Sequence, residues 1–206
     1  MPSRFVKNVM LVVVALTTAL LPLRSAYAQS SGSGEKAASA PVIYRVNSDG
    51  SKTIDKSIAA YAYYAPAPPA PASLAPETQI SASSVNGSIV ALSLSQGYYY
   101  HYAYYSIGNA QAKQTTYFYQ DQYGSQLIYW TQWDKVSGSA YQISILDLVN
   151  QSTGQVAGAW NIYKLVNPQV YQGISLYVPS AGHGTKMKNW LSQGLSGYYV
   201  EFIIGL

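Results

Sequence analysis

The stretch from Gly97 to Ile107 reads GYYYHYAYYSI and places six tyrosines and one histidine in positions 98–105. Tyrosine favours β-strands, in which successive side chains point to opposite faces. One face would carry Tyr98, Tyr100, Tyr102 and Tyr104. The other would carry Tyr99, His101, Ala103 and Tyr105. Either face can be the core face, and the face left open would offer rings and hydroxyls to a sugar or a partner protein.

The chain around this stretch repeats the β pattern between short turns. Segments rich in Val, Ile, Thr and Tyr recur every ten to fifteen residues, separated by turn residues such as Ser137-Gly138 and Ser152-Thr153-Gly154. This spacing predicts an all-β fold, an antiparallel β-sandwich or jelly roll. The expected strands are 79–84, 88–95, 98–107, 114–120, 126–133, 140–149, 156–165, 174–178 and 198–204. One short helix is expected at 186–193, where Met187, Trp190 and Leu191 share a helical face.

The first residues have the pattern of an export signal. Arg4 and Lys7 precede a nearly unbroken apolar run at 9–23, which leads to the cleavage-like Ala26-Tyr27-Ala28. This layout predicts a signal peptide at 1–28 and a secreted, extracellular or cell-envelope protein. A membrane attachment would come only from an uncleaved signal segment.

Two segments separate this signal from the predicted β-sandwich head at 77–206. A flexible N-terminal arm is expected at 29–64, with a hairpin around Asn47–Gly50, and residues 56–65 fit a strand or a short helix. Five prolines then fall within 65–76, at positions 66, 68, 69, 71 and 76. An Ala-Pro-rich stretch favours an extended polyproline II conformation, so this segment is predicted to be a stiff linker.

Composition excludes several functions. After the predicted signal is removed, nine Lys and Arg face eight Asp and Glu, and they form no extended basic cluster, which argues against nucleic acid as a partner. The chain has no cysteine, so thiol catalysis and cysteine-based metal sites are excluded. Charged residues are only 10% of the chain, so its stability should depend little on ionised pairs.

Enzyme chemistry has weak support in the sequence. Nothing near the two histidines, His101 and His183, has the spacing of metal ligands, and no nucleophile elbow is present. A carboxylate pair such as Asp134 with Glu201 would suit a glycosidase only if the fold brought the two together. We therefore expect no catalytic residues, metal or cofactor.

The candidate ligand-binding residues are aromatic. They are Tyr98, Tyr100, Tyr102 and Tyr104 of the tyrosine stretch, together with Trp130 and Trp133. Alternation puts Trp130 and Trp133 on opposite faces of a strand, so at least one should lie in the core. Asn86 and Asn150 each match Asn-x-Ser/Thr and are candidate glycosylation acceptors in predicted turns.

These observations favour a non-enzymatic structural or adhesive protein. An arm separated from its head by a stiff linker can add strands to a neighbouring head, so self-association by strand donation is expected. The alternative is a carbohydrate-binding module that uses exposed Tyr and Trp. A further alternative is a secreted hydrolase active in acid, with Asp134 or Glu201 as acid or base. An extracellular glycan or protein is the other partner that this composition suggests.

Overall fold

The computed structural model describes residues 34–71, 73, 94–180 and 182–205. These residues are nearly all β, with 67% strand and 1% helix. The strands are β1 Lys36–Ala38, β2 Val42–Val46, β3 Lys52–Ile54, β4 Tyr61–Pro66, β5 Gly97–Ile107, β6 Ala110–Gln120, β7 Gln126–Ser137, β8 Tyr141–Asn150, β9 Val156–Val166, β10 Gln169–Val178, β11 Thr185–Gln193 and β12 Ser196–Ile204. Within these ranges no helix is long and apolar enough to cross a membrane.

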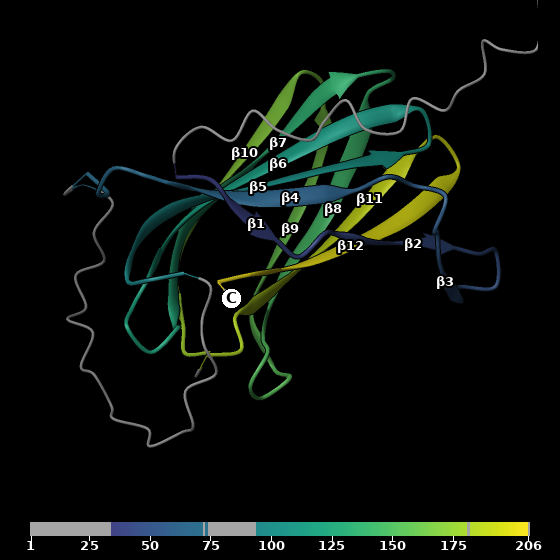
Figure 1. Ribbon diagram of the computed structural model, residues 1–206. Helices are drawn as coiled ribbons and strands as arrows, with labels where there is room; N and C mark the ends of the chain where they lie inside the picture. The colour runs from purple at the N-terminus through teal and green to yellow at the C-terminus, as the bar shows by residue number, and fades with distance from the viewer. Residues whose placement is uncertain (1–33, 72, 74–93, 181, 206) are drawn as a thin grey trace, which may run out of the picture. The chain divides into compact units, whose positions relative to one another are not determined.

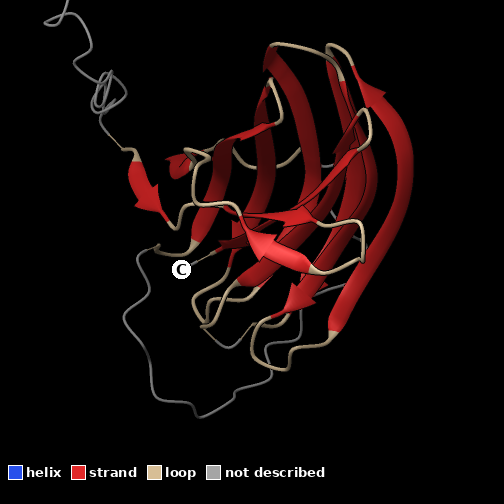
Figure 2. Ribbon diagram, turned by 90° about the vertical axis from the view of Figure 1, so that its right-hand side faces the viewer, coloured by secondary structure: helices blue, strands red, loops and turns tan. Residues whose placement is uncertain are grey.

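The strands form two antiparallel sheets of six strands each. Sheet A has the order β1-β4-β5-β6-β7-β10, and sheet B has the order β3-β2-β12-β11-β8-β9. The two sheets lie face to face, and the long strands β5 to β12 make most of each layer (Figures 1 and 2). The predicted β-sandwich is thereby confirmed.

Strand β5 shows which face of the tyrosine stretch is the core. Its odd-numbered residues from Tyr99 to Ile107 are buried between the sheets, whereas its even-numbered residues are half-buried on the outer side. His101 and Ala103 have no exposed surface. The choice that the sequence left open is settled, with Tyr98, Tyr100, Tyr102 and Tyr104 facing outward.

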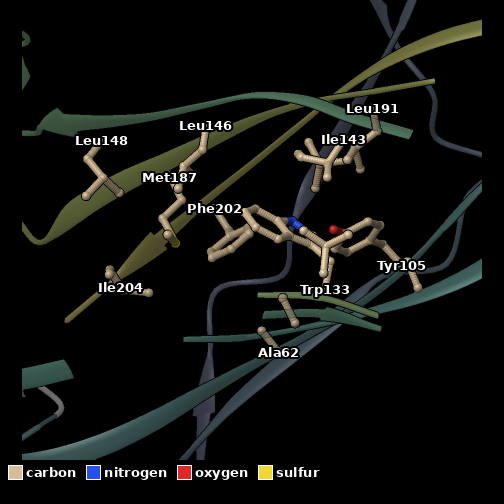
Figure 3. Packing of buried hydrophobic residues seen from close by; sticks show 14 of the residues in the cluster. Ala62, Tyr105, Trp133, Ile143, Leu146, Leu148, Met187, Leu191, Phe202 and Ile204 are labelled. Atoms are coloured by element: carbon tan, nitrogen blue, oxygen red, sulfur yellow. The ribbon is translucent and has the colours of Figure 1, made fainter. Parts of the chain in front are cut away.

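The core between the sheets contains both apolar and polar layers. Trp133 lies at its centre among Tyr105, Ile143, Leu191 and Phe202 (Figure 3). Beside these, the amide of Asn189 donates to Gln114 Oε1 at 3.0 Å, and the Gln114 amide donates to Thr131 Oγ1 at 3.0 Å. Because their side-chain groups satisfy each other, these polar residues are accommodated in the interior.

His101 and Trp133 differ from this polar layer. Neither ring nitrogen of His101 has a hydrogen-bond partner, and the same holds for the indole nitrogen of Trp133. The His101 ring stacks on Phe202 with centroids 4.9 Å apart. Burial lowers the pKa of His101 to about 3, so this histidine is neutral in the folded chain at ordinary pH.

The predicted helix at 186–193 is wrong, because this segment is strand β11. It pairs with β12 on one side and with β8 on the other. Met187, Asn189 and Leu191 point into the core, while Trp190 lies on the outer side. Met187, Trp190 and Leu191 fit a helical spacing as well, but pairing with two neighbouring strands decides the conformation.

The segment before the proline-rich stretch belongs to the same β-sandwich. The predicted hairpin is the β2–β3 pair, in which Tyr44 lies opposite Ile54, and residues 61–66 form strand β4. Strand β4 pairs with β5 in sheet A, and β2 pairs with β12 in sheet B. Each sheet therefore contains strands that precede the predicted 65–76 linker and strands that follow it. The strand expected at 79–84 and residues 88–93 of the strand expected at 88–95 lie outside the described residues, and residues 94 and 95 belong to no strand.

Candidate ligand-binding face

The outer side of sheet A carries a continuous aromatic surface, which we call the tyrosine face. Its residues come from strands β4, β5, β6, β7 and β10, and they are Tyr61, Tyr63, Tyr98, Tyr100, Tyr102, Tyr104, Tyr117, Tyr119, Tyr129, Trp130 and Tyr171. Cross-strand register brings them together, because Tyr61 lies opposite Tyr104 and Tyr63 lies opposite Tyr102. Outward positions of neighbouring strands in one sheet therefore form one surface.

The rings of the tyrosine face contact one another from β4 to β10. Tyr61 stacks on Tyr104 with centroids 4.7 Å apart and an interplanar angle of 6°. Tyr63 lies 5.0 Å from Tyr102. At the other end, Trp130 lies 5.7 Å from Tyr171, whose ring is half exposed. These contacts hold the rings in a fixed arrangement, so little side-chain entropy would be lost on binding a ligand.

A bulge brings one further ring to this face. The β6–β7 register shifts between Tyr117 and Phe118, so that Tyr129 and Trp130 follow each other on the outer side. Tyr129 lies 5.1 Å from Tyr117, and Trp130 lies 5.7 Å from it. Strict alternation would have put Tyr129 and Trp130 on opposite faces.

The tyrosine face has an open half and a covered half. Tyr61, Tyr63, Tyr102 and Tyr104 form the open half, in which Tyr61 is exposed and the other three are half-buried. Tyr117 and Tyr129 are each only 4% exposed, and the cluster that they form with Leu127 is packed against by Ala67 and Ala70 of the proline-rich segment and by neighbouring aromatic rings. Tyr117 also donates its hydroxyl to the carbonyl of Pro68 at 2.7 Å.

A small polar group borders the open half. Lys113 Nζ lies 5.3 Å from the Tyr102 ring centroid and 4.0 Å from Asp134 Oδ2. Gln132 Nε2 donates to Asp134 Oδ1 at 2.8 Å. Together these side chains offer hydrogen-bond donors and acceptors next to the rings.

Three phenols of the open half, those of Tyr63, Tyr102 and Tyr104, stay neutral over a wide pH range. Burial raises the pKa of Tyr104 to about 12, with smaller contributions from Tyr63 and the Asp134 carboxylate. Burial also raises the pKa of Tyr63 and Tyr102 above the ordinary value. The surface therefore keeps its hydrogen-bonding character from acid to mildly alkaline conditions.

The structure divides the predicted ligand-binding residues. Tyr98, Tyr100, Tyr102, Tyr104 and Trp130 all lie on the tyrosine face. Trp133 has no exposed surface, so the prediction for Trp133 is corrected: this residue belongs to the core. The sequence reasoning missed Tyr61, Tyr63, Tyr117, Tyr119, Tyr129 and Tyr171. The Tyr61-x-Tyr63 and Tyr117-x-Tyr119 alternations were signals that could have found four of them.

One of the two predicted glycosylation acceptors, Asn150, is not an open site in the structure. The Asn150 side chain is buried, donates its amide to the carbonyl of Pro179, and accepts from the Ser152 backbone at 2.9 Å. A glycan could reach this nitrogen only before the turn folds. Asn86 lies outside the described residues.

The carboxylates considered for catalysis do not converge. Asp134 lies on the outer face of sheet A, whereas Glu201 lies on the outer face of sheet B, within 3.8 Å of Lys186 Nζ and 3.9 Å of Lys188 Nζ. A glycosidase needs its two carboxyl groups on either side of one bond, which this placement does not provide. Among the residues placed in the structure, no three His, Asp or Glu side chains are grouped to share a metal ion.

Comparison with known proteins found no relative of this chain. No protein-family model, no curated protein and no solved structure matches the chain.

Proposed function

We propose that this chain is a non-catalytic adhesive β-sandwich of the cell exterior that binds saccharides through its tyrosine face. The observation that carries the proposal is the connected set of aromatic rings on the outside of sheet A, open at Tyr61, Tyr63, Tyr102 and Tyr104. A sheet that needed only one core face would not require a second aromatic layer.

The chemistry of this face suits a sugar ring. The faces of aromatic rings are electron-rich, and they attract the C–H groups on the flat side of a pyranose. Tyrosine hydroxyls, Gln132, Asp134 and Lys113 can exchange hydrogen bonds with sugar hydroxyls around the stacked ring. The carboxylates of Glu35 and Asp134 act on the rings of the open half, so a neutral saccharide fits better than an anionic one.

Removal of two open rings is expected to abolish most of the affinity. In a Tyr102→Ala/Tyr104→Ala double variant, binding to the best saccharide of a glycan array should weaken by about tenfold to a hundredfold, since stacked rings contribute about 0.5–1.5 kcal/mol each beyond area burial. Affinity is measured by calorimetry or polysaccharide pull-down with the full chain.

The matched control removes two tyrosines from the other sheet. Tyr44 and Tyr199 lie opposite each other in the β2–β12 pair, on the outer face of sheet B. A Tyr44→Ala/Tyr199→Ala variant should keep the affinity of the unchanged chain. The proposal fails if the array shows no saccharide binding, or if both double variants lose affinity equally.

A further inference from the structure

The segment of residues 36–71, which we call the edge segment, completes one edge of each sheet. Its strands β1 and β4 extend sheet A next to β5, and its strands β2 and β3 extend sheet B next to β12. Six residue pairs join β4 to β5, and five join β2 to β12. Without the edge segment, β5 and β12 would have unpaired backbone groups along one side.

The edge segment also inserts a ring between the sheets. Tyr64 is buried, its hydroxyl donates to the carbonyl of Ile203 at 3.3 Å, and it accepts from the Gly205 backbone at 3.1 Å. Its ring lies 5.1 Å from that of His101. Tyr64 thus connects the edge segment to both sheets at once.

A third attachment lies on the outer face. Beyond β4, the Ala67 backbone donates to the Tyr98 carbonyl at 2.9 Å, and Tyr117 binds the Pro68 carbonyl. Ala67 and Ala70 pack against the cluster of Tyr117, Leu127 and Tyr129, so removal of the edge segment would expose more of this apolar area. Recognition of a proline-rich chain by aromatic rings and main-chain hydrogen bonds is common in protein–peptide complexes.

The connection from the edge segment to β5 is far longer than the fold requires. Pro66 lies opposite Tyr99 in the antiparallel β4–β5 pair, so a hairpin of about two to five residues would join the two strands. The chain instead places residues 72–96 between the end of the edge segment and the start of β5, which is 25 residues. Fully extended, that length spans on the order of 85 Å, enough to reach a neighbouring molecule.

We propose that the edge segment exchanges between copies of this chain, so that residues 36–71 of one copy complete both sheets and cover Tyr117 and Tyr129 of another. The edge segment would make the same contacts with β5 and β12 of its own chain or of another copy. Exchange therefore changes only which chain the segment belongs to. Protein concentration then sets the balance between the two forms. Reciprocal exchange closes a dimer, and one-way exchange builds a filament.

Cysteine cross-linking can measure the exchange, because the chain has no cysteine of its own and only the introduced pair can form a disulfide. Ala62 of β4 lies opposite Ala103 of β5, and both are small and buried. Directly opposed positions of antiparallel strands are close enough for a disulfide. The Ala62→Cys/Ala103→Cys full chain is refolded over a range of concentrations, oxidised, and separated on a non-reducing gel.

We expect the ratio of cross-linked dimer to cross-linked monomer to rise about tenfold for each tenfold rise in protein concentration at low conversion. An Ala62→Cys/Ala112→Cys control, whose positions are not opposed in the sheet, should give no disulfide. The unmodified chain supplies a second readout: light and heavy isotope-labelled copies refolded together should give mixed dimers in native mass spectrometry. Disulfides that stay within one chain at every concentration, or an absence of mixed dimers, would overturn the proposal.

Discussion

Replacing His101 by phenylalanine is expected to reduce the loss of stability that we expect of the unchanged chain between pH 7 and pH 4. Burial lowers the pKa of His101 from 6.5 to about 3 in the folded chain. The unfolded chain therefore takes up a proton below pH 6.5 that the folded chain does not accept. Stability is full above pH 6.5 and falls as the pH drops toward 3.

The size of this effect follows from the shift. Each unit of pKa difference between the folded and the unfolded chain corresponds to about 1.4 kcal/mol. Protonation of His101 in the unfolded chain should therefore lower the unfolding free energy by about 3 kcal/mol between pH 7 and pH 4. Neither His101 nitrogen has a hydrogen-bond partner, and the rings that contact it are those of Tyr64 and Phe202. Burial alone lowers its pKa, so no neighbouring group compensates the charged form. Phenylalanine keeps the stacking on Phe202 and cannot be protonated.

Urea titrations at pH 7, 5.5 and 4 measure the effect. The carboxylates titrate in both chains, so the difference between the unchanged chain and the variant isolates His101. The control is His183→Asn at an exposed position. This variant should show the same dependence of unfolding free energy on pH as the unchanged chain. Equal loss of stability in His101→Phe and the unchanged chain would show that the buried histidine does not govern acid sensitivity.

Trp133→Ala is expected to lower the unfolding free energy by about 3–5 kcal/mol, the usual cost of removing a large buried aromatic side chain. Trp133 has no exposed surface, and it contacts residues of both sheets at the centre of the core (Figure 3). Trp133→Phe should cost less, because it keeps most of the ring and removes an indole nitrogen that has no partner.

Trp130→Ala is the matched comparison for this prediction. Trp130 is the same residue type three positions earlier in β7, but it lies half-buried on the tyrosine face. Its replacement should cost clearly less stability and should reduce saccharide affinity. Thermal or urea unfolding of the three variants gives the test, and equal destabilisation by Trp130→Ala and Trp133→Ala would contradict the placement of these two rings.

Local patterns in the sequence were sufficient for the fold class and for most strands of the head. Alternation and turn residues predicted strands near their observed positions from β5 to β10 and at β12, because a half-buried strand leaves a period of two in its side chains. The same reasoning placed Tyr98, Tyr100, Tyr102 and Tyr104 on one face. It failed at β11, where a helical and an extended spacing of Met187 and Leu191 are equally consistent with the sequence.

The candidate site could be predicted only in part. Its β5 tyrosines share one strand, so alternation groups them. Tyr61, Tyr63 and Tyr171 join them only through the register of β4 and β10, which lie far away along the chain. Tyr129 joins through a bulge that breaks alternation. Low charge content suggested tolerance of acid, yet one buried histidine predicts the opposite, and burial is a property of the folded chain.

GYYYHYAYYSI was by itself enough to determine a strand with two aromatic faces, because tyrosine strongly favours extended backbone and side chains alternate. Only the tertiary structure decided which face is open. Sheet B covers Tyr99, His101 and Tyr105 from one side, while the proline-rich segment covers part of the other. What covers a strand comes from residues distant in sequence, so no pattern within the strand can determine it.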